Sequence, residues 1–153
     1  MNGSWPLECE APLNATRAHH FASGAARAPV KPTILIAEDS SDAREMLGTL
    51  LSLKGYEVLS VENGVSAVEV ACAHRPDLIL LDWELPRLNG IAVIKTLRSR
   101  RDFRDTPMII VSGHDPGTHL EAALAAGCTE YLLKPIDFDR LDAILELNAS
   151  LTT

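Results

Sequence analysis

Polar side chains that could do chemistry follow four short apolar runs of this chain, at the point where each run ends. The runs end at Glu38-Asp39, Asp82, Ser112 and Lys134. Short apolar runs between helical patterns are typical of buried parallel strands, and α/β sheets bind ligands at the carboxyl ends of such strands. We therefore expect three carboxylates, one hydroxyl and one ammonium at one sheet edge. Such a set can bind a hard cation and do chemistry on a phosphoryl group.

The elements that must position these residues alternate strictly from Lys31 onward. Strands are expected at about residues 33–38, 56–61, 78–82, 107–112 and 131–134. Helices are expected at about 42–54 and from starting residues Asn63, Asn89, Asp115 and Asp137. Strands that alternate with helices predict an α/β fold, a doubly wound five-stranded parallel sheet with five helices on both faces. The 56–61 run shows partial alternation of apolar and polar residues, which favours an edge strand.

Composition and charge limit the classes of function. The 153 residues fit one domain, with 46% hydrophobic and 23% charged residues, and no second domain is expected. The net charge of −7 argues against binding to nucleic acid or to an anionic membrane surface. An arginine run between residues 98 and 104 could contact nucleic acid, but cations at a helix C-terminus also complement the helix dipole. We favour the second interpretation.

Residues 1–31 differ in character from the remainder of the chain. They are rich in proline and alanine and have no apolar periodicity, so a flexible arm is predicted there. The pair His19-His20 supplies too few ligands for a metal site by itself. The folded domain is expected at 32–149, followed by a tail at 150–153. With no secretory signal and no apolar run long enough to span a membrane, a cytoplasmic protein is expected.

The ordered set of strand-end motifs resembles the receiver domain of two-component response regulators. The resemblance covers about residues 32–149, and its specificity comes from the set, not from any one element. The motifs are Glu38-Asp39, the D-x-x-x-P-x-x-x-G loop from Asp82 to Gly90, Ser112-Gly113 and Lys134-Pro135. Spacings of 43, 30 and 22 residues separate Asp39, Asp82, Ser112 and Lys134 in turn, as in ordinary receivers.

The resemblance implies a flavodoxin-like strand order 2-1-3-4-5. It also implies that Asp82 accepts a phosphoryl group from a histidine of a sensor kinase or phosphotransfer protein. Mg²⁺ would be the cofactor, bound by Asp39, Asp82 and the backbone carbonyl of Glu84, with Glu38 acting largely through a water molecule. An alternative for Glu38-Asp39 is that these acids only cap the first helix.

Further roles follow from the same resemblance. Lys134 would pair with Asp82 and neutralise the phosphoryl oxygens, and its bond to the following proline would be cis. Ser112 would be the switch hydroxyl that binds a phosphoryl oxygen. Backbone N–H groups of Trp83 and Gly113 would complete the phosphoryl-binding cradle. Tyr131 matches the aromatic switch position, although a tyrosine in a strand is more often plain packing.

Glu84 and His114 stand at the two variable positions that flank the site in receivers. We expect both to tune the lifetime of the phosphoryl group, because they influence how water reaches it. The resemblance gives no direction for that effect.

The leading interpretation is a stand-alone receiver of the chemotaxis type that signals to a downstream protein effector, as a monomer or a weak phosphorylation-linked dimer. The receiver would catalyse only its own phosphorylation and dephosphorylation. One alternative is a small Mg²⁺-dependent phosphatase or phosphotransferase with an aspartyl phosphate intermediate. Such enzymes usually carry a second acid two residues after the nucleophile, where this chain has Glu84. A second alternative is a degenerate receiver that only binds partners.

Overall fold

The computed structural model of the chain describes residues 31–149, which alternate strands and helices as predicted. The strands are β1 (Thr33–Ala37), β2 (Glu57–Val61), β3 (Leu78–Asp82), β4 (Met108–Ser112) and β5 (Glu130–Leu133). The helices are α2 (Ser41–Leu53), α3 (Gly64–His74), α4 (Gly90–Arg98), α5 (Pro116–Ala126) and α6 (Phe138–Ala149), with a short 3-10 helix η1 (Arg101–Phe103). Except for Lys31, the predicted arm at 1–31 and the predicted tail at 150–153 lie outside the described residues.

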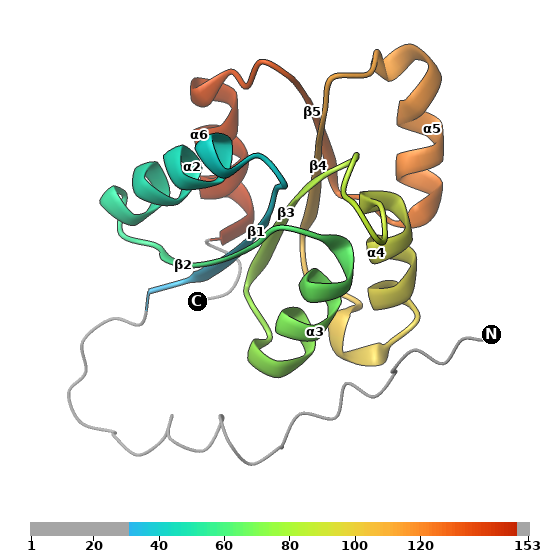
Figure 1. Ribbon diagram of the computed structural model, residues 1–153, viewed down its shortest axis with the longest axis horizontal. Coiled ribbons are helices and arrows are strands. Elements are labelled where there is room, and N and C mark those ends of the chain that lie inside the picture. Colours follow the sequence, from blue (N-terminus) through green and yellow to red (C-terminus); the bar gives the residue numbers. More distant parts are fainter. Residues whose placement is uncertain (1–30, 150–153) are drawn as a thin grey trace.

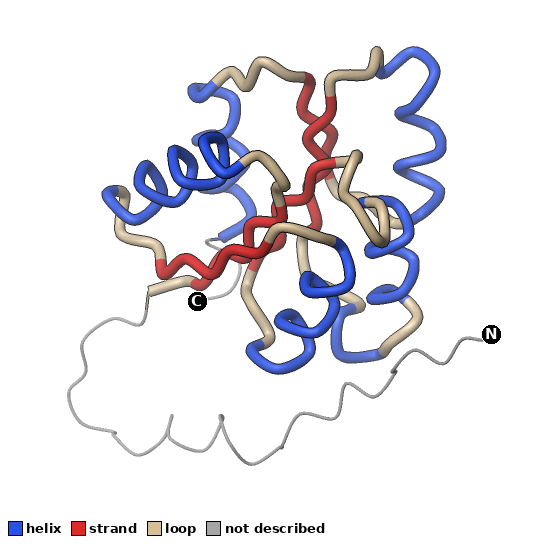
Figure 2. Tube along the Cα trace, in the orientation of Figure 1, coloured by secondary structure: helices blue, strands red, loops and turns tan. Residues whose placement is uncertain are grey.

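The five strands form one parallel sheet in the order β2-β1-β3-β4-β5. Figure 1 shows α2 and α6 on one side of this sheet and α3, α4 and α5 on the other. The strands form the middle layer between these two groups of helices (Figure 2). The predicted doubly wound α/β fold and its strand order are therefore confirmed.

Two apolar cores, one on each face of the sheet, explain why the strands read as continuous apolar runs. Successive strand side chains point to opposite faces, so Leu35 and Ile79 pack under α3, α4 and α5, whereas Ile34 and Leu78 pack under α2 and α6. Every residue of β3 and of β4 is buried. Strand β2 lies at an edge and has no buried residue, which confirms its prediction as an edge strand.

Short polar side chains start the helices at the carboxyl edge of the sheet. Asn63, Asn89 and Asp115 each accept a hydrogen bond from a backbone N–H in the first turn of α3, α4 and α5. Helix α2 begins one residue earlier than predicted because Ser40 caps it through the N–H of Ala43. These caps fix where each loop ends and therefore where its polar residues lie.

The glycine that ends the D-x-x-x-P-x-x-x-G motif allows α4 to start against the end of β3. A Cβ at Gly90 would lie 2.5 Å from the carbonyl oxygen of Asp82. The N–H of Gly90 also donates to the carbonyl of Trp83, at 2.9 Å. A larger residue would push the loop away from the sheet, so this glycine holds the loop closely around Asp82.

Arg98, the first residue of the arginine run, stabilises the fold at the opposite, amino edge of the sheet. The guanidinium of Arg98 donates to the carbonyl oxygens of Gly127, Phe103 and Arg104 at 2.6–3.3 Å. It thereby ties the end of α4 to η1 and to the turn before β5. This contact supports the interpretation of the run as a helix-terminal feature. Within residues 31–149, no helix has the length and apolar character needed to cross a membrane.

Candidate functional site

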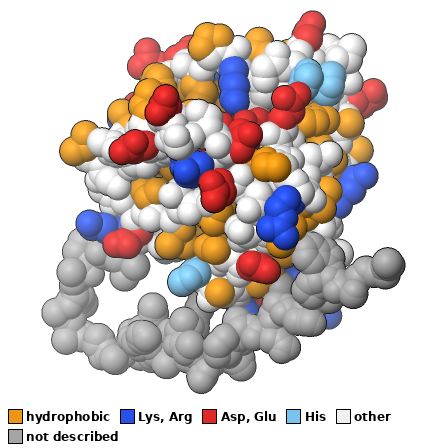
Figure 3. Space-filling model, viewed as in Figure 1, with side chains coloured by type: hydrophobic (Ala, Val, Ile, Leu, Met, Phe, Trp, Pro, Cys, Tyr) orange, Lys and Arg blue, Asp and Glu red, His pale blue; other side chains and the backbone are white. Residues whose placement is uncertain are grey.

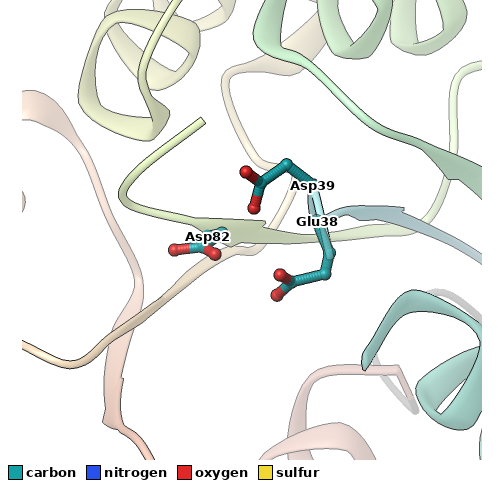
Figure 4. Close-up of side chains that lie close together, drawn as sticks. All are labelled: Glu38, Asp39 and Asp82. Atoms are coloured by element: carbon teal, nitrogen blue, oxygen red, sulfur yellow. The ribbon is translucent and has the colours of Figure 1, made fainter. Parts of the chain in front are cut away.

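Three carboxylates meet at the carboxyl edge of the sheet, as predicted from the strand ends. Glu38 and Asp39 follow β1, and Asp82 is the last residue of the neighbouring strand β3. Each offers an oxygen within 4.8 Å of the other two. Figure 4 shows the three side chains around one space at the strand ends. Glu38 and Asp82 are 5% and 6% exposed, whereas Asp39 is exposed to solvent.

Lys134 balances part of this negative charge. It follows β5, and its Nζ lies 3.0 Å from Asp82 Oδ2 and 3.6 Å from Glu38 Oε1. Burial lowers the pKa of the ammonium, but the hydrogen bond and charge of Asp82, together with the charge of Glu38, outweigh it and raise the pKa above its ordinary value. The bond between Lys134 and Pro135 is cis, as the resemblance implies.

The charged form of Glu38 is disfavoured by its surroundings. Burial raises the pKa of its carboxyl above the ordinary value; a hydrogen bond from the N–H of Ser40 opposes this shift, and the charge of Asp82 adds to it. The carbonyl of Glu38 accepts a hydrogen bond from Arg44 on α2, at 2.9 Å. The sequence analysis did not include Arg44, although a basic residue in the first turn of the following helix is the signal for it.

The loop after β3 turns its backbone toward Asp82. The N–H of Glu84 donates to Asp82 Oδ1, at 3.0 Å. The N–H of Trp83 donates instead to the carbonyl of Val111 on β4, also at 3.0 Å. The backbone donor that reaches the Asp82 carboxylate is therefore that of Glu84, and the cradle role expected for the Trp83 N–H remains a prediction.

Ser112 ends β4 beside Asp82 and is 1% exposed. Its Oγ accepts a hydrogen bond from the N–H of His114, at 2.9 Å. Gly113 between them is exposed, and a Cβ there would meet nothing within 4 Å. The space beside Gly113 is therefore open, whereas Ser112 itself is buried and its backbone is part of the sheet.

Tyr131 on β5 is buried, with 7% of its surface exposed. Its hydroxyl donates to the carbonyl of His114, at 2.8 Å, and its ring lies edge-on to Trp83, with centroids 6.3 Å apart. The structure thus brings the two predicted switch residues, Ser112 and Tyr131, to the same short loop after β4.

The two flanking residues, Glu84 and His114, contact each other. His114 Nε2 lies 2.5 Å from Glu84 Oε2. The ring of His114 also stacks on that of His119, with centroids 4.4 Å apart and planes 8° apart. His119 could not be predicted as part of the site, because it lies five positions after His114 and meets it only when α5 packs against the loop.

This arrangement combines two chemical capacities. The cluster of Glu38, Asp39 and Asp82 offers only oxygen ligands, which suit a hard divalent cation. The ammonium of Lys134, which lies beside both Asp82 and Glu38, can offset the charge of an oxyanion bound to Asp82. A buried carboxylate that belongs to such a cluster and pairs with an ammonium is suited to attack an anionic phosphoryl group.

Known proteins match most of this chain. The family model described as "Response regulator receiver domain" matches residues 34–146. The response regulator MprA of Mycobacterium sp. (strain KMS) is 37% identical over 108 residues, which cover 71% of this chain and 46% of MprA. The polar-differentiation response regulator DivK of Brucella anthropi is 34% identical over 108 residues, which cover 71% of this chain and 88% of DivK. The matched part of this chain thus spans less than half the length of MprA.

Solved structures resemble the fold as well. The receiver domain of the Francisella response regulator 1452 matches with a TM-score of 0.75 and 28% identity, over 80% of this chain and 100% of that one. The receiver domain of the sensor histidine kinase PA1611 of Pseudomonas aeruginosa matches with a TM-score of 0.72 and 31% identity, over 78% and 98% of the two chains. That structure contains a magnesium ion coordinated in its active-site cleft.

Proposed function

Because this chain belongs to the response regulator receiver domain family, we propose that Asp82 accepts a phosphoryl group from a phosphohistidine of a sensor kinase or a phosphotransfer protein. The observation that carries the proposal is the position of Asp82. It lies 3.0 Å from the ammonium of Lys134 and within 4.8 Å of the carboxylate oxygens of Glu38 and Asp39.

The transfer forms one bond and breaks one. An Asp82 carboxylate oxygen attacks phosphorus, the phosphorus–nitrogen bond to the donor imidazole breaks, and its electron pair remains on that nitrogen. Lys134 offsets charge on the phosphoryl oxygens, and the N–H of Glu84 already points at the acceptor carboxylate. We also assign the backbone N–H of Gly113 and, after release from Val111, that of Trp83 to the phosphoryl oxygens.

The donor set fits Mg²⁺ as the cofactor. Two buried carboxylates and one exposed carboxylate, all within reach of one another, make an oxygen-only site for a hard cation. Asp39 and Asp82 would hold the ion directly, together with the backbone carbonyl of Glu84, and Glu38 would act through a water molecule. When bound, Mg²⁺ offsets the repulsion between the acceptor carboxylate and the phosphoryl group. The magnesium ion in the Pseudomonas receiver supports this choice.

Phosphorylation would be read by the loop after β4. The Ser112 hydroxyl, which now accepts from the N–H of His114, would turn to donate to a phosphoryl oxygen. That movement changes the loop whose carbonyl at His114 binds the Tyr131 hydroxyl. The buried ring of Tyr131 would then shift, and with it the surface formed by α5, β5 and α6.

The signal would pass to a downstream protein effector, from a cytoplasmic protein that is a monomer or a weak phosphorylation-linked dimer. The net charge of −7 supports a protein partner and no nucleic acid or membrane. Glu84 and His114, which pair across the loops that follow Asp82 and Ser112, would tune how long the phosphoryl group persists.

Labelling with acetyl phosphate tests the proposal. The protein is expected to incorporate one phosphoryl group per chain in Mg²⁺ and none with a chelator, because the carboxylates need a cation to accept it. Asp82→Asn should abolish the label, and the matched control Asp105→Asn, an exposed position at the opposite sheet edge, should retain it. Labelling that survives Asp82→Asn would remove Asp82 as the acceptor. Steady turnover of small phosphate esters would favour an enzyme instead.

A further inference from the structure

His114 has partners at its backbone N–H, its carbonyl, its ring nitrogen Nε2 and the face of its ring. Its N–H donates to Ser112 Oγ at 2.9 Å, and its carbonyl accepts from the Tyr131 hydroxyl at 2.8 Å. Its ring nitrogen Nε2 meets Glu84 Oε2, and the face of its ring stacks on His119. A histidine in a solvent-exposed loop has no need of so many partners, so the orientation of this ring is a specified feature of the site.

His119 fixes that ring from the side of α5. Its ring is nearly parallel to that of His114, with 8° between the planes and 4.4 Å between the centroids. It also meets Trp83 edge-on, with centroids 4.8 Å apart and planes at 78°. Thr118 Oγ1 lies 2.7 Å from its Nδ1 and limits rotation of the ring. His119 therefore contacts residues from both loops that flank Asp82.

The Glu84–His114 pair connects those two loops. Glu84 follows β3 and binds Asp82 through its N–H, whereas His114 follows β4 and binds Ser112 through its own. Asp82 and Val111 are register partners in the sheet, so the pair spans the gap between adjacent strand ends. On the face seen in Figure 3, histidine side chains lie side by side next to acidic and hydrophobic ones.

The stacked histidines do not form a second metal site. Stacked rings keep their nitrogen lone pairs in two separate, nearly parallel planes, whereas two ligands of one ion must converge on it. Within residues 31–149, the one group of three or more candidate ligands that come together is Glu38, Asp39 and Asp82. The ring contacts of His119 with Trp83 and His114 are aromatic, so they can hold the neighbouring rings in place.

We propose that His119 is a positioning residue for phosphoryl chemistry at Asp82. By stacking on His114 and contacting Trp83, it holds the Glu84–His114 pair closed across the mouth of the site and so slows loss of the phosphoryl group. This inference rests on the proposed function. The inference goes beyond the proposed function because it assigns a role to a residue of α5 that lies outside the acceptor site.

The step that His119 slows is hydrolysis of the acyl phosphate. A water oxygen attacks phosphorus, the bond from phosphorus to the Asp82 oxygen breaks, and its electron pair returns to the carboxylate. The protons of the water leave with the inorganic phosphate, unless a nearby base takes one of them. While Glu84 and His114 are paired, neither is free to take the proton of that water, and their side chains narrow its access. Release of the pair exposes the phosphorus and frees a base beside it.

The test follows the decay of labelled protein in Mg²⁺ after the phosphodonor is removed. His119→Ala should shorten the lifetime by about threefold or more, because it removes the stack that orients His114. His119→Phe should restore the original lifetime, since a flat ring remains in place. Glu121→Ala, which removes an exposed neighbour on α5, is the matched control and should leave the lifetime unchanged.

A double substitution separates positioning from a general loss of stability. In a His114→Ala background, His119→Ala should cause no further change, because His119 acts through the His114 ring. An effect of equal size in that background would contradict the inference, as would equal lifetimes in His119→Ala and the unsubstituted protein. Failure of the unsubstituted protein to take up label would contradict the proposed function itself, whereas normal labelling with unchanged decay contradicts this inference alone.

Discussion

The two edges of the sheet treat charged side chains in opposite ways. At the amino edge, each nitrogen of the Arg98 guanidinium donates to a backbone carbonyl, of Gly127, Phe103 or Arg104. At the carboxyl edge, the carboxylates of Glu38 and Asp82 are buried beside each other, and the ammonium of Lys134 lies 3.6 Å from one and 3.0 Å from the other. At the amino edge the positive charge is hydrogen-bonded to the backbone, whereas at the carboxyl edge negative charges are buried close together.

This contrast distinguishes charged side chains that stabilise the fold from charged side chains that are available to a ligand. A cation that is hydrogen-bonded to several backbone carbonyls stabilises the folded chain and has few donors left for a ligand. Neighbouring carboxylates, one with a raised pKa, cost stability until a cation arrives, and such sites are typical of function. We therefore expect substitutions at the amino edge to change stability and those at the carboxyl edge to change phosphorylation.

The largest expected effect is that of Lys134→Ala on labelling. Loss of the ammonium removes the charge that offsets the phosphoryl oxygens, so the rate of labelling by acetyl phosphate should fall by about 100-fold. The free energy of unfolding should change by less than about 1 kcal/mol, because the ammonium is partly exposed. Lys54→Ala is the matched control: its ion pair with Asp142 has similar exposure, and labelling should be unaffected.

Arg98→Ala should produce the reverse pattern. Three carbonyls lose a charged donor, so the free energy of unfolding should fall by about 2–3 kcal/mol in urea denaturation. The labelling rate per folded molecule should stay within about twofold of the original, since the acceptor site lies at the other edge. Arg101→Ala, at an exposed position of η1, is the control and should leave stability nearly unchanged. A loss of labelling in Arg98→Ala would break the comparison.

Glu38→Gln should stabilise the metal-free protein. The pKa of Glu38 is raised by burial above its ordinary value of 4.5, so the folded state binds this proton more tightly than the unfolded state does. Glu38 therefore lowers the free energy of unfolding above its folded pKa, and this cost disappears as the pH falls below 4.5. At pH 7 the substitution should raise the free energy of unfolding by about 1 kcal/mol.

Calorimetric melts with a chelator between pH 4 and pH 8 measure this effect. The gain should be present at neutral pH and absent in acid, and the substituted protein should bind Mg²⁺ more weakly. A gain of equal size at both ends of the range would mean that the Glu38 charge is not its cause. Glu57→Gln, on the exposed edge strand β2, is the control and should show neither change.

The smallest effect is expected at Gly113. A Cβ there meets nothing within 4 Å and the backbone needs no positive φ, so Gly113→Ala should stabilise the fold by about 0.5 kcal/mol. At the amino edge, Gly127 has φ 112° and a Cβ would lie 2.8 Å from Arg98 Cγ, so Gly127→Ala should destabilise it. Thermal melts of the two variants compare the edges directly; destabilisation by Gly113→Ala would contradict the steric argument.

Local pattern was sufficient to predict the elements and the edge at which polar residues gather. Apolar runs that end at a polar residue predict buried parallel strands. The residues predicted to start helices, such as Asn89 and Asp115, are N-caps in the structure. Strands β1 and β5 end one residue before their predicted ends, although the N–H groups of Glu38 and Lys134 still donate to Val61 and Ser112 of the neighbouring strands. The helix η1 was not predicted, because three residues carry too little pattern.

Side-chain partners depended on the tertiary structure. By itself, the sequence determined that Glu38, Asp39, Asp82, Ser112 and Lys134 would meet, because parallel strands bring their carboxyl ends to one edge. It could not determine that Trp83 donates to Val111, that Glu84 pairs with His114, or that His119 stacks beside them. Those contacts join separate loops, and their geometry depends on how closely α4 and α5 pack onto the sheet, which no local spacing encodes.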